Sequence, residues 1–398
     1  LLNLLIIIKK MSNLKYHSAL PENDRSYTAR ADGFSEFNTC DFVLNADMDR
    51  ALVLGSVRVE FDFVTNRSGA NALRPNTANK GDVVDRITID NMAGAHCLFE
   101  SVSTTLSMGG GQVENIDSYP RIVKVVNTAT SNQDDHHRSD ALCEMRTPHT
   151  RHNQYLLRDR NTNTTDSSLN IFPDVSVKPF ICLNRPLQGD SIDFSKSGAI
   201  RLSINFARNV AVYHGADARN GNLTPNYVLK NLRCVYKTIP AKNQPVVMNR
   251  VLSMNQLLES SNASINTSVP AVVNAVSACF LPQSEENTYS ANNLSLHRPL
   301  SINNIQMNYN DSSNAYQTFR LDNQQELVLN GLASLRSAGI NNASFENLDG
   351  NNAFITGIDF KENIDFSQGN KFSMTISSGI DSLNPVILFL YFHSLVSM

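Results

Sequence analysis

The sequence predicts an all-β fold made of two tandem β-sandwiches, and three observations lead to this prediction. The first is a composition rich in Asn and Ser, which favour turns over helices. The second is a series of segments in which apolar and polar residues alternate with a period of two. The third is a set of similar segments that recur in the same order in both halves of the chain.

The length and charge of the chain restrict the classes of protein to which it can belong. The 398 residues exceed an ordinary single domain, and a hydrophobic content of 41% is sufficient for packed cores. Only 18% of the residues are charged, the formal net charge is -3, and no block of like charges occurs. Because a protein that neutralises phosphates needs clustered Lys and Arg, we expect no direct, sequence-specific binding of nucleic acid.

The cysteines are spread singly along the chain, with no CxxC pair. This spacing favours small buried side chains in a reducing compartment, and a disulfide framework is the less favoured alternative. The six positions are Cys40, Cys97, Cys143, Cys182, Cys234 and Cys279.

Both ends of the chain are apolar. LLNLLIIIKK at the start is too short to cross a bilayer and lacks the features of a signal peptide. We expect either an extension that precedes a start at Met11, or a short anchor that contacts a neighbouring subunit or a membrane surface. The C-terminal PVILFLYFHSLVSM is typical of a fully buried strand.

Two segments show the clearest strand alternation. Their core-facing residues should be Val57, Val59, Phe61 and Phe63 in residues 56–64, and Ile200, Leu202, Ile204 and Phe206 in residues 199–206. Further strands are expected at residues 84–90, 97–106, 227–238, 272–281, 300–309, 352–360 and 371–377, and turn residues separate them as in sandwiches.

Helix signals are few. One helix is expected at residues 116–129, with Asp117 or Ser118 as cap and Pro120 in the first turn. Another is expected at residues 321–337, with Asp322 or Asn323 as cap.

Similar segments in the two halves indicate a tandem duplication. RALVLGSVRVEF from Arg50 matches RPLSINNIQMNY from Arg298, SIDFSKSG (191–198) matches NIDFSQGN (363–370), and PNYVLKNLRCVY from Pro225 matches PVILFLYFHSL from Pro385. Because the order is the same, we interpret the halves as two copies of one β domain. The first copy should carry longer loops, around residues 64–82, 127–170 and 207–224.

The expected divisions follow from these matches. They are an N-terminal extension at residues 1–39, a first domain at 40–240, a connector at 241–269 and a second domain at 270–398.

Residue types that bind metals gather in DDHHRSDALCEMRTPHTRH, residues 134–152. The segment contains His136, His137, Cys143, His149 and His152, together with Asp134, Asp135, Asp140 and Glu144. It matches no closed zinc pattern, so we favour a polar exposed loop over a metal or catalytic site. The adjacent His136 and His137 could still sense pH at a subunit contact.

Two other motifs give even weaker support for a catalytic or ligand-binding site. MGGGQ (108–112) lacks the Gly-Lys-Ser/Thr of a phosphate-binding loop, and GADARNGN (215–222) lacks the distal Glu of a calcium loop. No nucleophile motif is present. We therefore expect no enzyme, and no catalytic, cofactor-binding or metal-ligating residue.

Several of these segments resemble the double jelly-roll major capsid proteins of virophages, polinton-like viruses, adenoviruses and lipid-containing phages. They are RALVLGSVRVEFDF with RPLSINNIQMNYND, SIDFSKSG with NIDFSQGN, ENIDSYPRIVKVV and the terminal PVILFLYFHSLVSM. The resemblance implies two tandem eight-stranded jelly-roll β-sandwiches, with a few short helices and long loops in the first. It also implies a structural protein whose homotrimers form pseudo-hexameric capsomers that tile an icosahedral shell.

The same resemblance implies the partners and the location. A chain of this kind would contact its own copies, neighbouring capsomers, penton and minor capsid proteins, and an internal membrane through its N-terminus. It would be made in the cytoplasm or nucleus of a host cell and would end in the virion.

Three alternatives stay open. One is another viral shell element such as a penton protein, which a basic N-terminal arm would favour. A second is a spike, receptor-binding or carbohydrate-binding sandwich, which the absence of Trp counts against. A third is a β-sandwich enzyme that uses the His-rich loop.

Overall fold

The computed structural model describes most of the chain. The described residues are 14–22, 33–68, 88–108, 111–131, 143–146, 170–214, 224–267, 269, 271–289, 291–296, 302–311, 314–321, 324–350, 353–366, 371–378 and 380–398. Most of the loop segments expected at 64–82 and 127–170, half of the one expected at 207–224, and all of residues 1–13 lie outside these ranges.

Within the described residues, two consecutive sets of eight strands form two sandwich units. The first unit contains β1 (Lys15–Ala19), β2 (Thr39–Leu44), β4 (Arg58–Ser68), β6 (Phe99–Leu106), β7 (Gly111–Ile116), β8 (Asn170–Val177), β11 (Ile200–Phe206) and β13 (Thr224–Pro240). The second contains β14 (Val247–Leu258), β15 (Asn262–Thr267), β16 (Val272–Pro282), β17 (Ile302–Asp311), β18 (Asn314–Leu321), β19 (Thr356–Asp365), β20 (Lys371–Ser378) and β21 (Val386–Ser397).

Both units have the same connectivity. In the first unit the sheets run β1-β13-β4-β8 and β2-β11-β6-β7, and in the second they run β14-β21-β16-β19 and β15-β20-β17-β18. When the strands of each unit are numbered 1 to 8 in chain order, the two sheets of either unit have the orders 1-8-3-6 and 2-7-4-5, which is the jelly-roll topology. The expectation of two tandem eight-stranded jelly rolls is therefore confirmed.

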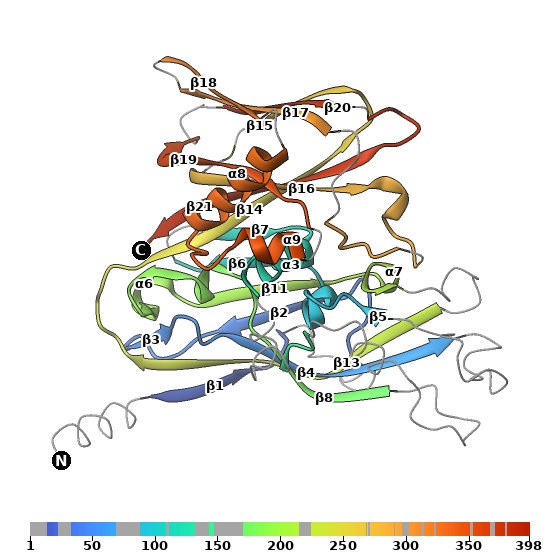
Figure 1. Cartoon of the computed structure of the whole chain (residues 1–398). Coiled ribbons are helices and arrows are strands. Elements are labelled where there is room, and N and C mark those ends of the chain that lie inside the picture. Colours follow the sequence, from blue (N-terminus) through green and yellow to red (C-terminus); the bar gives the residue numbers. More distant parts are fainter. Residues whose placement is uncertain are drawn as a thin grey trace.

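The four half-sandwiches form three main sheets. We call β1-β13-β4-β8, with the short β3 (Arg50–Val53) and β10 (Ser191–Asp193), the first outer sheet. We call β15-β20-β17-β18 the second outer sheet. The other two halves join through β7 and β14 into a central sheet, to which β9 (Pro186–Gln188) adds at β14. Figure 1 shows the outer sheets at opposite ends of the molecule.

The expected faces of the two clearest strands are confirmed. Val57, Val59, Phe61 and Phe63 are buried, and so are all four apolar residues expected on β11. The C-terminal strand β21 is buried from Val386 to Ser394, as its unbroken apolar run predicts.

Two segments that the sequence leaves outside the domains are strands. β1 lies in the expected N-terminal extension and pairs with β13 over its whole length. β14 and β15 lie in the expected connector, where β14 pairs with β21 at twelve positions. β1 is the first strand of the first jelly roll, and β14 and β15 are the first two strands of the second. Local sequence does not reveal this, because long-range pairing decides which sheet a strand joins. We propose a division near residues 241–246, between β13 and β14.

The duplicated segments divide into correct and incorrect matches. IDFS at 192–195 lies between the sixth and seventh strands of the first unit, and Ile364 to Phe366 lie at the end of the sixth strand, β19, of the second. Pro225 lies at the start of the eighth strand β13, and Pro385 directly precedes the eighth strand β21. The match of Arg50 with Arg298 is wrong. It pairs the third strand, β4, with the fourth strand, β17, whereas the counterpart of β4 is β16. Every half-buried strand shows the same alternation of apolar and polar residues. A match without gaps therefore cannot distinguish one strand from the next strand along the chain.

Both expected helices are present. α3 (Tyr119–Thr130) carries Pro120 in its first turn, but Ser118 before it has φ 51° and forms no side-chain capping bond. α8 (Gln324–Ser337) is followed by α9 (Phe345–Gly350), and the expected caps Asp322 and Asn323 lie outside the described residues. Each helix lies between the fifth and sixth strands of its unit. Buried residues of both units form one hydrophobic cluster.

The remaining elements are short. They are β5 (Thr88–Ile89), which is all that the structure describes as strand in the segment expected at 84–90, its partner β12 (Tyr213–His214), α6 (Phe194–Ser197), α7 (Asn209–Val212) and the 3-10 turns η2 (Gly94–Leu98), η4 (Cys182–Asn184) and η6 (Gln283–Glu285).

Candidate interaction surfaces and the junction between the two units

The two units meet where β7 lies parallel to β14, with Asn115 opposite Leu252. The neighbouring Glu114 is completely buried. Its carboxylate accepts hydrogen bonds from the backbone N–H of Val251 at 2.8 Å, from the backbone N–H of Cys182 at 2.6 Å, and from the Arg185 guanidinium at 2.6 Å. One carboxylate thus connects β7, the turn at 182–185 and β14.

Burial and pairing oppose each other at Glu114. Burial raises the pKa of its carboxyl group, while Arg185 and the two N–H donors act to lower it. The Arg185 guanidinium also lies 4.1 Å from the centre of the Phe180 ring. Because both charges are away from water, removal of one partner would leave the other uncompensated.

Helix α3 carries a second charged contact across the junction. Arg121 is buried and donates hydrogen bonds to the backbone carbonyls of Asn293 and Ser295, at 2.9 Å for Ser295. Its guanidinium lies 4.2 Å from the centre of the Phe389 ring on β21. Arg121 of the first unit thus supplies the hydrogen-bond donors that these two carbonyls of the second unit would otherwise find in water.

Helices cover the outward face of the 1-8-3-6 sheet in the second unit. Phe389 lies under α3, and the Tyr391 hydroxyl donates to the carbonyl of Ser118 just before that helix, at 3.2 Å. His393 bonds Ser277 at 2.7 Å, and Ser277 bonds Ser334 of α8 at 2.9 Å. All three β21 side chains are buried. This explains why β21 carries no Lys, Arg, Asp or Glu on either of its faces.

The outward face of the first outer sheet is open by comparison. Arg233 is exposed, and the next outward residues of β13, Val235, Lys237 and Ile239, are only half-buried. Arg233 pairs with Glu60 at 2.8 Å across the strands. Tyr16 of β1 is 72% exposed beside Lys237, whose ammonium lies 5.2 Å from the ring centre.

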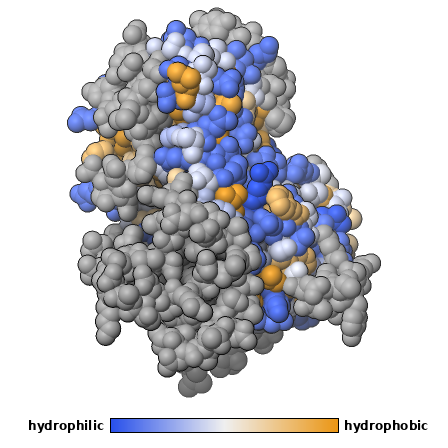
Figure 2. Space-filling model, turned by 90° about the vertical axis from the view of Figure 1, so that its right-hand side faces the viewer, coloured by the Kyte–Doolittle hydropathy of each residue, from blue (hydrophilic) through white to orange (hydrophobic). Residues whose placement is uncertain are grey.

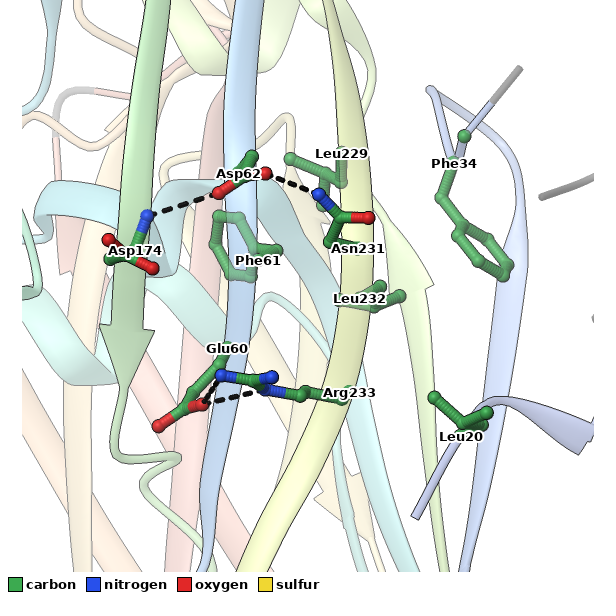
Figure 3. A pocket seen from close by; sticks show the side chains of 11 residues that line it. Leu20, Phe34, Glu60, Phe61, Asp62, Asp174, Leu229, Asn231, Leu232 and Arg233 are labelled. Atoms are coloured by element: carbon green, nitrogen blue, oxygen red, sulfur yellow. Dashed lines mark hydrogen bonds and ion pairs between the residues drawn. The ribbon is translucent and has the colours of Figure 1, made fainter. Parts of the chain in front are cut away.

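A groove of about 590 Å³ crosses this open face (Figure 3). Asp62 lies at its centre and accepts hydrogen bonds from the Asp174 backbone N–H at 3.1 Å and from the Asn231 side chain. Asn231 and Asp174 both have positive φ, at irregular positions where β13 and β8 pair with β4. Such bulges re-aim side chains next to a strand, and here both point polar groups at one carboxylate.

Leu20 and Phe34 form the other wall of the groove, across from Leu232 (Figure 3). The Phe34 backbone pairs with Leu229, at 2.9 and 2.7 Å. Gly33 just before it has φ +81°, and a Cβ there would lie 2.6 Å from the Leu229 carbonyl oxygen. A glycine is thus required for the chain to approach β13 so closely.

The His-rich segment is described only at residues 143–146. Glu144 is buried there, where it pairs with Arg146 at 2.8 Å, contacts His96 at 3.5 Å and accepts the Lys178 backbone N–H at 3.0 Å. Burial would raise the pKa of Glu144, but His96 and Arg146 lower it to about 2. Glu144 therefore anchors this segment to the first unit.

The other members of that cluster lie outside the described residues: Asp134, Asp135, His136, His137, Asp140, His149 and His152. The same holds for all of GADARNGN and for Gly109 and Gly110 of MGGGQ. Within the described ranges, no group of three or more His, Cys, Asp or Glu is arranged to hold a metal ion. All six cysteines are free thiols, of which only Cys143 is exposed.

Exposed hydrophobic side chains are scattered. Figure 2 shows one face on which the coloured atoms are mostly hydrophilic, with separate hydrophobic spots. Among the described residues, the most exposed large apolar side chains are Leu383 at 85%, Tyr16 at 72% and Phe37 at 69%. Among the helices that the structure describes, none is both long and apolar enough to span a bilayer.

The sequence did not point to Glu114, Arg121, Arg185 or Asp62. The only available signal was a charged residue inside an apolar segment, as for Arg121 in YPRIVKVV. Such residues are rarely buried unless they are paired.

The comparisons with known proteins agree on the fold. No protein-family profile and no curated protein matches the chain. The solved structure of the Faustovirus major capsid protein superposes with a TM-score of 0.58 at 9% identity, over 97% of this chain and 90% of that one.

Two further structures superpose over nearly the whole chain. One is VP54 of the virus PBCV-1, fitted into a reconstruction of the virophage Sputnik, with a TM-score of 0.52 at 9% identity over 97% and 95% of the two chains. The other comes from the Sputnik virophage itself, with a TM-score of 0.51 at 10% identity over 96% and 86%. The chain therefore shares the double jelly-roll fold of these viral capsid structures.

Proposed function

We propose that this chain is the major capsid protein of a virus and acts as a structural subunit of the virion. The observation that carries the proposal is the superposition on the Faustovirus major capsid protein over 97% of this chain and 90% of that one. A fold alone does not define a function. Here the buried side chains of Glu114 and Arg121 connect the two units through hydrogen bonds, which suits a rigid building block.

The proposed assembly is a homotrimer. Two jelly rolls in each of three chains give six corners, so the trimer can act as a pseudo-hexameric capsomer in an icosahedral shell. Glu114 and Arg121 support this role because they fix one jelly roll against the other. Neighbouring capsomers, penton and minor capsid proteins are the proposed partners, and the N-terminal segment would contact an internal membrane.

The purified protein tests this proposal through its mass in solution. We expect a stable particle with three times the 44.1 kDa of the chain, which unfolds only when it dissociates. Image averages of assembled shells should show six-cornered capsomers. A strictly monomeric, well-folded protein at micromolar concentration would argue against the capsomer.

A further inference from the structure

A third charged contact crosses the junction of the two units at Asp90. This residue lies between β5 and η2 of the first unit and is 1% exposed. Its Oδ2 atom accepts hydrogen bonds from the Lys124 ammonium at 2.5 Å and from the Asn292 side-chain amide at 2.7 Å. Lys124 belongs to α3, and Asn292 to the segment that leads from η6 to β17 in the second unit. A lysine, a carboxylate and an asparagine thus meet at one oxygen atom.

These three side chains contain the groups that an amide bond between side chains requires. The Lys124 nitrogen is a nucleophile once it loses a proton, and Asp90 is a base in hydrogen-bond contact with it. The Asn292 amide is the electrophile, and its leaving nitrogen contacts the same carboxylate. Its carbonyl oxygen accepts the Leu294 backbone N–H at 3.0 Å, which would stabilise the negative charge that develops there during attack.

The reacting groups are held close together and away from water. Both nitrogens bond the same Oδ2 atom, so they lie no farther apart than the sum of the two distances. The Lys124 side chain is only 12% exposed. The other Asp90 oxygen accepts the backbone N–H groups of Met92 at 2.9 Å and Ala93 at 2.8 Å, which fix the carboxylate. Groups positioned in this way react far more readily than the same groups free in solution.

The charge state of the pair defines what Asp90 can do. Burial raises the pKa of Asp90, but Lys124, Asn292 and the Ala93 N–H together lower it below its ordinary value. Before any reaction the pair is therefore an ammonium and a carboxylate, with a Lys124 proton directed at Oδ2. Buried charges lack the stabilisation that water provides, so the transfer of this proton gives a neutral pair at a smaller cost than at the surface.

We propose that Lys124 and Asn292 form an isopeptide bond that joins the two units covalently, with Asp90 as the catalytic base and acid. Asp90 takes a proton from the Lys124 ammonium, and the free amine attacks Cγ of Asn292. As the Cγ–Nδ2 bond then breaks, Asp90 relays a proton from the attacking nitrogen to the leaving one. The product is a secondary amide. The two protons that Lys124 loses leave with the Asn292 nitrogen as an ammonium ion, so no further reactant is consumed.

Mass spectrometry of the purified, denatured full chain tests this inference. The wild type should weigh one ammonia molecule less than its sequence requires, and a tryptic digest should contain a branched peptide that joins Lys124 to Asn292. Lys124→Arg keeps a cation beside Asp90 but has no amine, and Asn292→Ala removes the electrophile. We expect both variants to have the full mass of their sequences, and circular dichroism checks that they are folded.

Two further variants separate the base from the reacting groups. Asp90→Ala keeps the amine and the amide but lacks the base, so most of this protein should keep its full mass after the wild type is completely joined. Lys242→Arg is the matched control, because Lys242 forms an ion pair with Asp190 at a more exposed position. The control should lose ammonia as the wild type does.

Three results would overturn the inference. The first is a wild type of full mass that trypsin cleaves after Lys124. The second is a loss of ammonia that persists in Lys124→Arg, since it would come from another asparagine. The third is a loss of water with Lys124 joined to Asp90, which would make the acid the reacting partner in place of Asn292. The proposed capsomer does not depend on this bond and is tested separately by the mass of the native particle.

Discussion

The two 1-8-3-6 sheets share a topology and differ in their environment. In the second unit the outward side chains of β21 are Phe389, Tyr391 and His393, all buried under helices. In the first unit the outward side chains of β13 include Arg233 and Lys237, which face water. The covered strand β21 has no Lys, Arg, Asp or Glu on either face, and the open strand β13 carries Arg233 and Lys237 on its outward face.

The difference also separates two kinds of ion pair. Glu114 and Arg185 at the junction are almost wholly removed from water, whereas Glu60 and Arg233 on the open face are partly solvated. Their geometry is similar, with N–O distances of 2.6 and 2.8 Å. Solvent access decides how much each contributes, since water screens the exposed pair.

The largest expected effect is therefore at the junction. Glu114→Ala leaves Arg185 buried without a counter-charge and leaves the N–H groups of Cys182 and Val251 without their acceptor. We expect the free energy of unfolding to fall by about 3–5 kcal/mol. Urea denaturation measures this change. The matched control is Glu60→Ala, which should cost at most about 1 kcal/mol. Equal losses in both variants would contradict the distinction.

A second substitution removes the contact that α3 makes with the second unit. Arg121→Met keeps an apolar stem over Phe389 but leaves the carbonyls of Asn293 and Ser295 without a donor. We expect a loss of about 2–3 kcal/mol, because hydrogen bonds to charged groups are involved. Thermal unfolding at matched protein concentration tests this. Arg233→Met is the control on the open sheet, and a larger loss there than at Arg121 would contradict the comparison.

The covered face should also make stability depend on pH. Burial, with a smaller effect from Arg185, lowers the pKa of His393 to about 3. The unfolded chain binds a proton at this residue near pH 6.5, and the folded protein does not until about pH 3. The stability contributed by neutral His393 is therefore complete above pH 6.5 and is lost as the pH falls toward 3.

Denaturation of wild type and His393→Gln between pH 7 and pH 4 measures this contribution. The wild type should lose about 1.4 kcal/mol more per pH unit than the variant once the pH is well below 6.5. Parallel stability curves for the two proteins would show that His393 is not kept neutral by the fold.

The smallest expected effect is in the groove of the open sheet. Asp62→Asn keeps one acceptor for the Asp174 N–H and loses the second acceptor facing Asn231. We expect a change of about 1 kcal/mol or less in the free energy of unfolding. A loss as large as that of Glu114→Ala would mean that the groove, and not the junction, stabilises the first unit.

The features that could be predicted from the sequence are those that depend on the local alternation of apolar and polar residues. The buried faces of β4 and β11 follow directly from a period of two, and so does the all-β class. β14 lies in the expected connector, and its place in a sheet depends on β21, which lies more than a hundred residues further along the chain. The place of the short strand β1 likewise depends on a distant partner, since it pairs with β13.

The junction was not predictable from local patterns either. Glu114 is held by Cys182, Arg185 and Val251, which come from two distant segments. Arg121 bonds carbonyls more than 170 residues away. The IDFS match succeeded because its apolar residues Ile192, Phe194, Ile364 and Phe366 are buried before the seventh strand of each unit. It marks a shared corner of the fold and no binding site.

Hydroxyl-radical footprinting of the purified protein tests the distinction between the covered and the open sheet most directly, since it reads the exposure of single side chains. Phe389 and Tyr391 are buried under helices and should react slowly, while Tyr16 on the open sheet should react as fast as the exposed Leu383. Phe389 and Tyr391 that react as fast as Tyr16 would contradict this distinction.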